Sequence, residues 1–143
     1  MIIAAPVIVG IVLILLFAIG ALSREPKLPD VKFIDFKVDR TIIKQGEQFK
    51  ITFDIINNEP STNASSVAVR TTYDGQYRVF AIEEPLTSIA DPIGANGGKA
   101  GLQTITVTGL AVDQPSLGAN FNISLYVGIE VTDTKTLRVM LEK

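Results

Sequence analysis

The sequence predicts an all-β domain, an immunoglobulin-like antiparallel β-sandwich of about seven strands, preceded by one transmembrane α-helix. Three observations carry this prediction. Across residues 31–143, apolar residues repeatedly alternate with polar ones, which is the pattern of half-buried strands. Turn-forming residues separate these stretches at short intervals, as in two-sheet sandwiches. In residues 1–23, by contrast, 19 positions are hydrophobic, and the rest of the chain keeps an ordinary apolar content of about 40%.

The N-terminal segment is predicted to be a transmembrane anchor, residues 1–23, that contacts membrane lipid through residues 2–22. These 21 residues carry no charge, and a helix of that length rises about 32 Å, which matches the hydrocarbon core of a bilayer. No Lys or Arg precedes the apolar run, and the run exceeds the usual ~7–15 residues of a signal peptide. We therefore expect a retained anchor rather than a cleaved signal peptide or a pilin-like leader. Residues 24–30 form a short proline-bearing linker.

Basic residues and glycosylation sequons give opposite indications of the orientation of the anchor in the membrane. Arg24, Lys27 and Lys32 follow the helix, and basic residues favour the cytoplasmic side. Two N-glycosylation sequons, which begin at Asn63 and Asn122, point to an extracytoplasmic domain instead.

The β-domain is predicted to span residues 31–143, and its first half is predicted to hold three strands. From Ile34 to Val38 apolar residues occupy every second position, whereas Val31 and Phe33 belong to the opposite phase, so we expect a bulge or a switch of sheet near Phe33 and Ile34. The following segments are a turn at 44–47, a strand at 49–55, a loop at 57–63 and a strand at 67–73.

The second half is predicted to begin with a hairpin, because Asp74-Gly75 fits a type I′ turn between strands that end at Tyr73 and resume at Tyr77. Residues 83–101 form a long irregular segment with two prolines and four glycines. The remaining segments are a strand at 102–110 with a possible bulge at Gly109, a loop at 113–119, a strand at 121–131, a turn at 132–135 and a strand at 137–141.

The composition excludes several classes of chemistry. The chain has no His and no Cys, so it cannot build a Ser-His-Asp or Cys-His catalytic centre, a zinc site with N/S ligands or a disulfide framework. A formal charge of −2 argues against a nucleic-acid partner, which would require a basic surface. We therefore expect no enzymatic activity, no cofactor and no metal site.

Two segments resemble ligand sites at first sight. Residues 94–101 are glycine-rich like a phosphate-binding loop, but Lys99 is followed by Ala100 and no helix follows, so a mobile loop at a contact surface is the preferred interpretation. Glu83, Glu84 and Asp91 could offer oxygen ligands to Ca²⁺, but they lack the spacing of a calcium-binding loop.

Four aromatic residues are the candidate protein–protein interface: Tyr73, Tyr77, Phe80 and Tyr126. Tyrosine is favoured at interfaces because it combines apolar area with a hydroxyl group. Tyr126 shares its phase with polar Asn122 and Ser124, and Phe80 is out of phase with Val79, so both are expected to point away from the core. The alternative is that these are scattered surface aromatics.

The stretch from Val31 to Gly75 resembles the opening of CARDB-type immunoglobulin-like surface domains, which are common on archaeal cell surfaces. The matching residues are Phe36-Lys37-Val38, Gly46-Glu47 and residues 49–58, which read FKITFDIINN. The layout of one N-terminal helix and one β-sandwich is also similar to archaeal flagellum stator proteins, without a diagnostic motif. The resemblance implies a cell-membrane, single-pass protein whose β-domain is extracytoplasmic.

The sequence thus favours a membrane-anchored, non-enzymatic structural or interaction protein. We expect an accessory subunit of a larger membrane or cell-envelope complex, in a homo- or hetero-oligomer, because a linker of about seven residues spans only ~25 Å. Two alternatives remain open at this point. One is a free-standing adhesion or ligand-binding module that depends on calcium or glycan, and the other is a stator-like protein.

Overall fold

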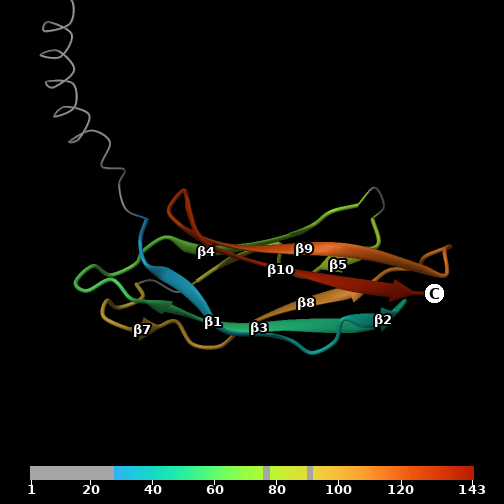
Figure 1. Cartoon of the computed structure of the whole chain (residues 1–143), viewed down its shortest axis with the longest axis horizontal. Helices are drawn as coiled ribbons and strands as arrows, with labels where there is room; N and C mark the ends of the chain where they lie inside the picture. The colour runs from blue at the N-terminus through green and yellow to red at the C-terminus, as the bar shows by residue number, and fades with distance from the viewer. Residues whose placement is uncertain (1–27, 76–77, 90–91) are drawn as a thin grey trace, which may run out of the picture.

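The protein is a sandwich of two β-sheets (Figure 1). The computed structural model describes residues 28–75, 78–89 and 92–143. The expected anchor at residues 1–23 and most of the expected linker lie outside these residues. Within the described part of the chain, no helix has the length and apolar character needed to cross a membrane.

Ten strands build the described domain: β1 (Val31–Val38), β2 (Ile42–Lys44), β3 (Gln48–Asn57), β4 (Val67–Tyr73), β5 (Phe80–Ile82), β6 (Leu86–Ser88), β7 (Gly98–Lys99), β8 (Gln103–Gly109), β9 (Ser116–Val127) and β10 (Glu130–Glu142). The first sheet has the order β1-β3-β8-β5, with β7 also paired to β3. The second sheet has the order β2-β10-β9-β4-β6.

This strand order is that of an immunoglobulin-like sandwich. The first two long strands, β1 and β3, share a sheet with β8 and β5, and the last two strands, β9 and β10, lie in the other sheet. The expected strand count was too low, because four strands have only two or three residues. One strand pair departs from the expected antiparallel arrangement, because β2 pairs with β10 in parallel.

The core lies between the sheets and follows the alternation in the sequence. In β3, every second residue from Phe49 to Ile55 is buried, and the intervening residues are exposed or half-buried. Phe49 and Phe53 of this strand are fully buried, as is Phe121 of β9 in the facing sheet. Burial of these alternating apolar side chains is the main favourable term for the fold.

The first strand contains the predicted irregularity. The pairing of β1 with β3 shifts register between Ile34 and Lys37, and Asp35 has a positive φ of 53°, so a bulge is present close to the expected position. The chain then leaves the first sheet after Val38 and enters the second at Ile42 as the edge strand β2. The first strand and its continuation therefore belong to different sheets.

The predicted hairpin at Asp74-Gly75 is wrong, because β4 lies in the second sheet and β5 lies in the first. The backbone N–H of Asp74 donates to the Asn120 carbonyl oxygen at 3.0 Å, which holds the end of β4 against β9. Phe80 at the start of β5 is buried against Phe49 and Phe121. Burial of this phenylalanine draws β5 into the opposite sheet, where it pairs with β8.

Three other boundaries differ from the sequence prediction. Residues 83–101 include β6, β7 and the buried side chains of Ile89 and Ile93, so this segment contributes to the core. The turn after β9 is at Gly128 and Ile129, not at 132–135. Gly109 shows no register shift; a Cβ atom there would lie 2.6 Å from the Leu141 Cδ1 atom, so glycine permits close packing.

Candidate functional site at the linker end of the sandwich

At the end of the sandwich where β1 begins, the side chains of Asn57, Glu59 and Asp133 bind backbone groups of other segments. We call this end of the sandwich the linker end. Val31 at the start of β1 pairs with Asn57 at the end of β3, and Val67 at the start of β4 pairs with Val127 at the end of β9. Phe33 of β1 is hydrogen-bonded to Asp133 of β10, so the start of β1 and the β9–β10 turn lie at the same end, as Figure 1 shows.

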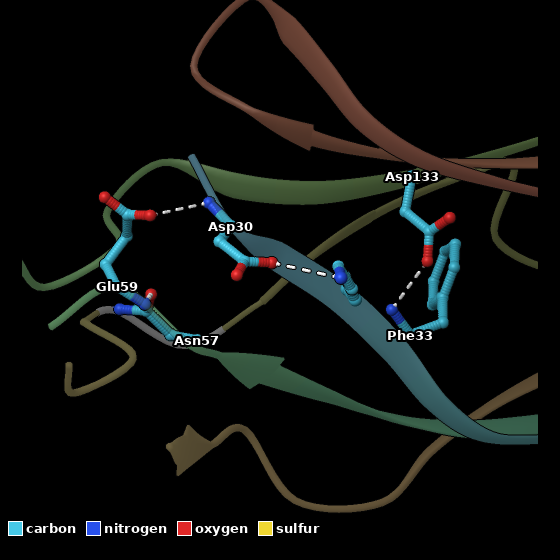
Figure 2. A network of polar contacts seen from close by, with 6 residues as sticks. Asp30, Phe33, Asn57, Glu59 and Asp133 are labelled. Atoms are coloured by element: carbon cyan, nitrogen blue, oxygen red, sulfur yellow. Dashed lines mark hydrogen bonds and ion pairs between the residues drawn. The ribbon is translucent and has the colours of Figure 1, made fainter. Parts of the chain in front are cut away.

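Asp30 is held on both sides where the linker meets the domain. Its backbone N–H donates to Glu59 Oε2 at 2.9 Å (Figure 2), and its carbonyl oxygen accepts from the Asn58 N–H at 2.8 Å. Its carboxylate forms an ion pair of 3.3 Å with Lys32 Nζ. The last linker residue is thus fixed to the loop that follows β3.

Asn57 is fully buried and organises that loop. Its amide nitrogen Nδ2 donates to the carbonyl oxygens of Thr62 at 2.9 Å and Ile93 at 3.0 Å. Its Oδ1 atom accepts from the Glu59 N–H at 3.0 Å, which positions Glu59 for its contact with Asp30. Through these three hydrogen bonds, the buried amide connects the 58–63 loop to residue 93.

Asp133 ties the two sheets together at the same end. Its Oδ2 atom accepts from the Phe33 backbone N–H in β1 at 3.0 Å, and its Oδ1 atom accepts from the Thr134 N–H at 2.9 Å. Figure 2 shows Asp133 reaching from β10 toward β1. The register of β10 against β9 shifts between Val131 and Asp133, and this irregularity lies directly beside the carboxylate.

The tip of the β9–β10 turn is apolar and exposed. Gly128 has a φ of 64°, as the first central residue of a type II′ turn requires, and its N–H donates to the Ser66 carbonyl oxygen at 2.9 Å. Ile129 at the second central position is 94% exposed. Leu28 and Val131, which are 48% and 40% exposed, lie at the same end of the molecule.

The four candidate interface aromatics do not form one surface. Phe80 is only 3% exposed, so its expected surface position is wrong; it packs in the core with Phe49 and Phe121. Tyr73 is half-buried beside it, and its hydroxyl donates to the Phe80 carbonyl oxygen at 3.0 Å and accepts from the Phe80 N–H at 3.3 Å. Tyr77 lies outside the described residues.

Tyr126 lies apart from this pair, on the solvent-facing side of the second sheet. It is five residues from Phe121 along β9, a separation of about 17 Å in a strand. The guanidinium carbon of Arg70 on β4 lies 5.8 Å from the centre of its ring. The sequon residues Asn63 and Asn122 are both exposed, the first in the 58–63 loop and the second on β9.

Two carboxylates with shifted pKa values lie on other parts of the sandwich. Asp74 accepts from the Asn120 backbone N–H at 2.8 Å, and this bond holds the pKa of Asp74 below its ordinary value. Glu47 accepts from the Lys44 N–H at 2.7 Å, and this bond is the main cause of its lowered pKa. Both groups are exposed and fix turns.

The segments that resembled ligand sites are built into the scaffold. The Gly97 N–H donates to the Asn57 carbonyl oxygen at 2.7 Å, and the next two residues form β7. Glu84 Oε2 accepts from the Thr87 hydroxyl at 3.3 Å, while Asp91 is not among the described residues. In the portion of the chain that the structure describes, no three His, Cys, Asp or Glu side chains gather as metal ligands.

The residues of the linker end were missed by sequence reasoning. Asn57, Glu59 and Asp133 were interpreted only as turn or loop residues, because a hydrogen bond between positions 33 and 133 leaves no local pattern. The run Asn57-Asn58-Glu59-Pro60 directly after an alternating strand was a weak signal, since such residues often bind nearby backbone groups.

Comparisons with known proteins show similarity in structure only. No protein-family model matches the chain, and no curated protein matches it. Its structure is similar to SSP-19, an MSP-domain-like protein of Caenorhabditis elegans, with 9% identity over 75% of this chain and 99% of that chain, and a TM-score of 0.47.

Two further solved structures are similar at comparable levels. A domain of the Pseudomonas fluorescens alkylpurine DNA glycosylase AlkC has 14% identity, covers 80% of this chain and 31% of that one, and gives a TM-score of 0.46. The periplasmic chaperone SfaE has 13% identity, covers 74% and 54%, and gives a TM-score of 0.42. No match supports the resemblance to CARDB-type domains or stator proteins, and the fold assignment stands on the strand pairing itself.

Proposed function

We propose that this protein is a membrane-anchored, non-enzymatic interaction protein, an accessory subunit that presents its β-sandwich to another membrane or cell-envelope protein. Residues 2–22 anchor it in the lipid bilayer, and the β-domain is extracytoplasmic. The domain binds its partner near the membrane surface, because the linker between the anchor and β1 is short.

The fixed junction between linker and domain carries this proposal. Asp30 is bound through both of its backbone groups, to Glu59 and to Asn58. Phe33, three residues further, is bound to Asp133 of the opposite sheet. A free adhesion domain gains reach from a loose junction, whereas a subunit that must meet a neighbour in one orientation gains from a fixed one.

The surface offered to a partner includes the solvent-facing side of β4 and β9. Arg70 and Tyr126 lie together there, and both residue types are enriched at the centres of protein interfaces. Polar Asn122 and Ser124 share this face of β9. Tyr73 contributes less, because its hydroxyl is already bonded to the Phe80 backbone.

Native mass measurement after mild detergent solubilisation from the source membrane tests the proposal. We expect a species heavier than the 15.4 kDa chain, with a defined stoichiometry. The variant Tyr126→Ala should shift the protein toward the single chain, and Thr104→Ala, exposed on β8 of the other sheet, is the matched control. A lone wild-type chain with no bound protein would refute the accessory-subunit role.

A protease-protection assay with a C-terminal tag tests the placement of the domain separately. Digestion of the tag in intact cells is expected for an extracytoplasmic domain. A tag that is digested only after lysis would place the domain in the cytoplasm and contradict the proposal.

A further inference from the structure

We propose that the tip of the β9–β10 turn, Gly128-Ile129, rests in the interfacial layer of the membrane that residues 2–22 span. This inference rests on the proposed function, because only an anchored domain holds its linker end beside a bilayer. The contact would be the second attachment of the domain to lipid, made by the folded sandwich.

The first observation is an isoleucine where the fold does not need one. Ile129 occupies the second central position of a two-residue turn and is 94% exposed. Turns of this type usually carry Asn, Asp or Ser there, since polar side chains suit a fully hydrated corner. A β-branched apolar side chain in this position gains nothing from the core, so its apolar surface is available for an external contact.

The second observation is the position of this side chain on the molecule. β1 and β10 both begin at the linker end, and the bond from the Phe33 N–H to Asp133 Oδ2 fixes one beside the other. Leu28 is five residues before Phe33, and Ile129 is four residues before Asp133. The two exposed apolar residues therefore lie at the same end of the molecule, together with Val131, which is 40% exposed.

The third observation is the reach of the chain. The apolar segment ends at Leu22, six residues before Leu28, and six extended residues span at most about 20 Å. The headgroup layer on each side of the hydrocarbon core is about 5–8 Å thick. The linker is long enough to cross this layer and short enough to keep the linker end near it.

The attachment of Asp30 to the domain indicates which face of the domain is directed at the membrane. Asp30 is bonded to Asn58 and Glu59, so the chain is fixed to the linker end from Asp30 onward, and only the few residues before Asp30 separate this end from the anchor. The face that receives the linker is then the face directed at the bilayer. An exposed isoleucine on that face is stabilised by entering the interfacial layer, where apolar side chains leave water.

A single-tryptophan experiment tests the contact, because the chain contains no Trp. The full chain carrying Ile129→Trp is reconstituted into phosphatidylcholine vesicles at a low protein-to-lipid ratio. Its emission is compared with and without lipids that carry bromine on the acyl chains. The matched control is Ile42→Trp, which places the same indole at an apolar, 58% exposed position on the edge strand β2, at the opposite end of the sandwich.

We expect the emission of Ile129→Trp to be blue-shifted, and its quenching by brominated lipid to be about twofold or more stronger than that of Ile42→Trp. Equal quenching of the two variants would overturn the inference. A blue shift at position 129 without lipid quenching would also overturn it, because the tip would then contact protein.

Flotation of the same vesicles separates this inference from the proposed function. If the protein floats with the vesicles and Ile129→Trp is not quenched, the anchor holds and only the lipid contact of the turn is refuted. If the protein does not float with the vesicles, the membrane-anchored function is refuted, and the lipid contact falls with it.

Discussion

The Asp133 carboxylate accepts a hydrogen bond from the Phe33 backbone N–H at 3.0 Å, across 100 positions of sequence. This bond joins the first strand of one sheet to the last strand of the other. The same carboxylate also accepts from the Thr134 N–H at 2.9 Å. One side chain thereby satisfies two N–H groups, one on each of two strands in different sheets.

Replacing Asp133 with Ala should destabilise the fold by about 2 kcal/mol, because two backbone N–H groups lose a charged acceptor. Thermal unfolding of the full chain in detergent measures the change. Asp113→Ala, in the exposed loop before β9, is the control and should leave the midpoint nearly unchanged. Equal midpoints for the two variants would show that the Asp133 contacts contribute little.

Replacing Asn57 with Asp should produce a pH-dependent loss of stability. The buried Nδ2 atom donates to two carbonyl oxygens, and a carboxylate there would face them without protons to donate. Burial disfavours the charged form, so the folded-state pKa of the new carboxyl group is raised above its unfolded value. The folded state then binds more protons than the unfolded state in this window, and stability falls as pH rises.

Unfolding midpoints of Asn57→Asp at pH 4 and pH 7 provide the measurement, with Asn58→Asp, an exposed neighbour, as the control. The gap between the two variants should widen toward pH 7. A gap that is independent of pH would mean that the carboxylate at position 57 escapes into water.

Replacing Tyr73 with Phe should destabilise the fold by about 1 kcal/mol, because the hydroxyl bonds with the Phe80 N–H and carbonyl oxygen are lost. Its aromatic contacts with Phe80 and Phe121 remain. Tyr126→Phe should leave the unfolding midpoint almost unchanged, since the Tyr126 ring faces solvent beside Arg70. If chemical denaturation ranks the two variants in the reverse order, the structural role assigned to Tyr73 is wrong.

Replacing Thr71 with Val should stabilise the protein by about 1 kcal/mol. The Thr71 side chain is buried, and its Oγ1 atom has no hydrogen-bond partner among the described residues. Valine has nearly the same shape and removes the cost of burying an unpaired hydroxyl group. Thr72→Val on the exposed face of β4 is the matched control, and a lower midpoint for Thr71→Val than for this control would contradict the expectation.

The lowered pKa of Asp74 predicts a small loss of stability in acid. Its bond from the Asn120 N–H favours the ionised form, so the folded-state pKa lies below the ordinary value of 3.8. The stabilisation is fully present above pH 3.8 and is lost as pH falls through the folded-state pKa. Midpoints of wild type and Asp74→Asn should therefore converge as pH decreases; a difference that is constant from pH 6 to pH 2 would contradict this.

The long strands could be predicted from the sequence because their side chains alternate with period two. β3 and β4 follow from this pattern almost residue by residue, and the bulge in β1 follows from its change of phase. The partner strands could not be derived in the same way. Asp74-Gly75 has the composition of a hairpin turn, but the burial of Phe80 in the opposite sheet overrides that local preference.

The candidate site was less predictable than the fold, since its contacts join positions far apart in the chain. Asn57 looks like an ordinary loop residue until Thr62 and Ile93 are brought against it. Ile129 was placed within an extended strand, because Ile129 and Val131 continue the alternation of β9 past the turn. Because the chain turns back at Gly128, Ile129 lies on the surface and not in the core.

The antiparallel pairing of β1 with β3 has a mechanical consequence. A pull on the linker acts along β1, while β4 and β9 of the second sheet would be held by a bound partner. The hydrogen bonds between β1 and β3 run perpendicular to that force. They are therefore loaded in shear and share the force, whereas bonds loaded along their own direction would break one after another. The bond from Phe33 to Asp133 passes part of the same force to the second sheet. An attachment loaded in shear withstands tension on the linker far better than one whose hydrogen bonds break one at a time.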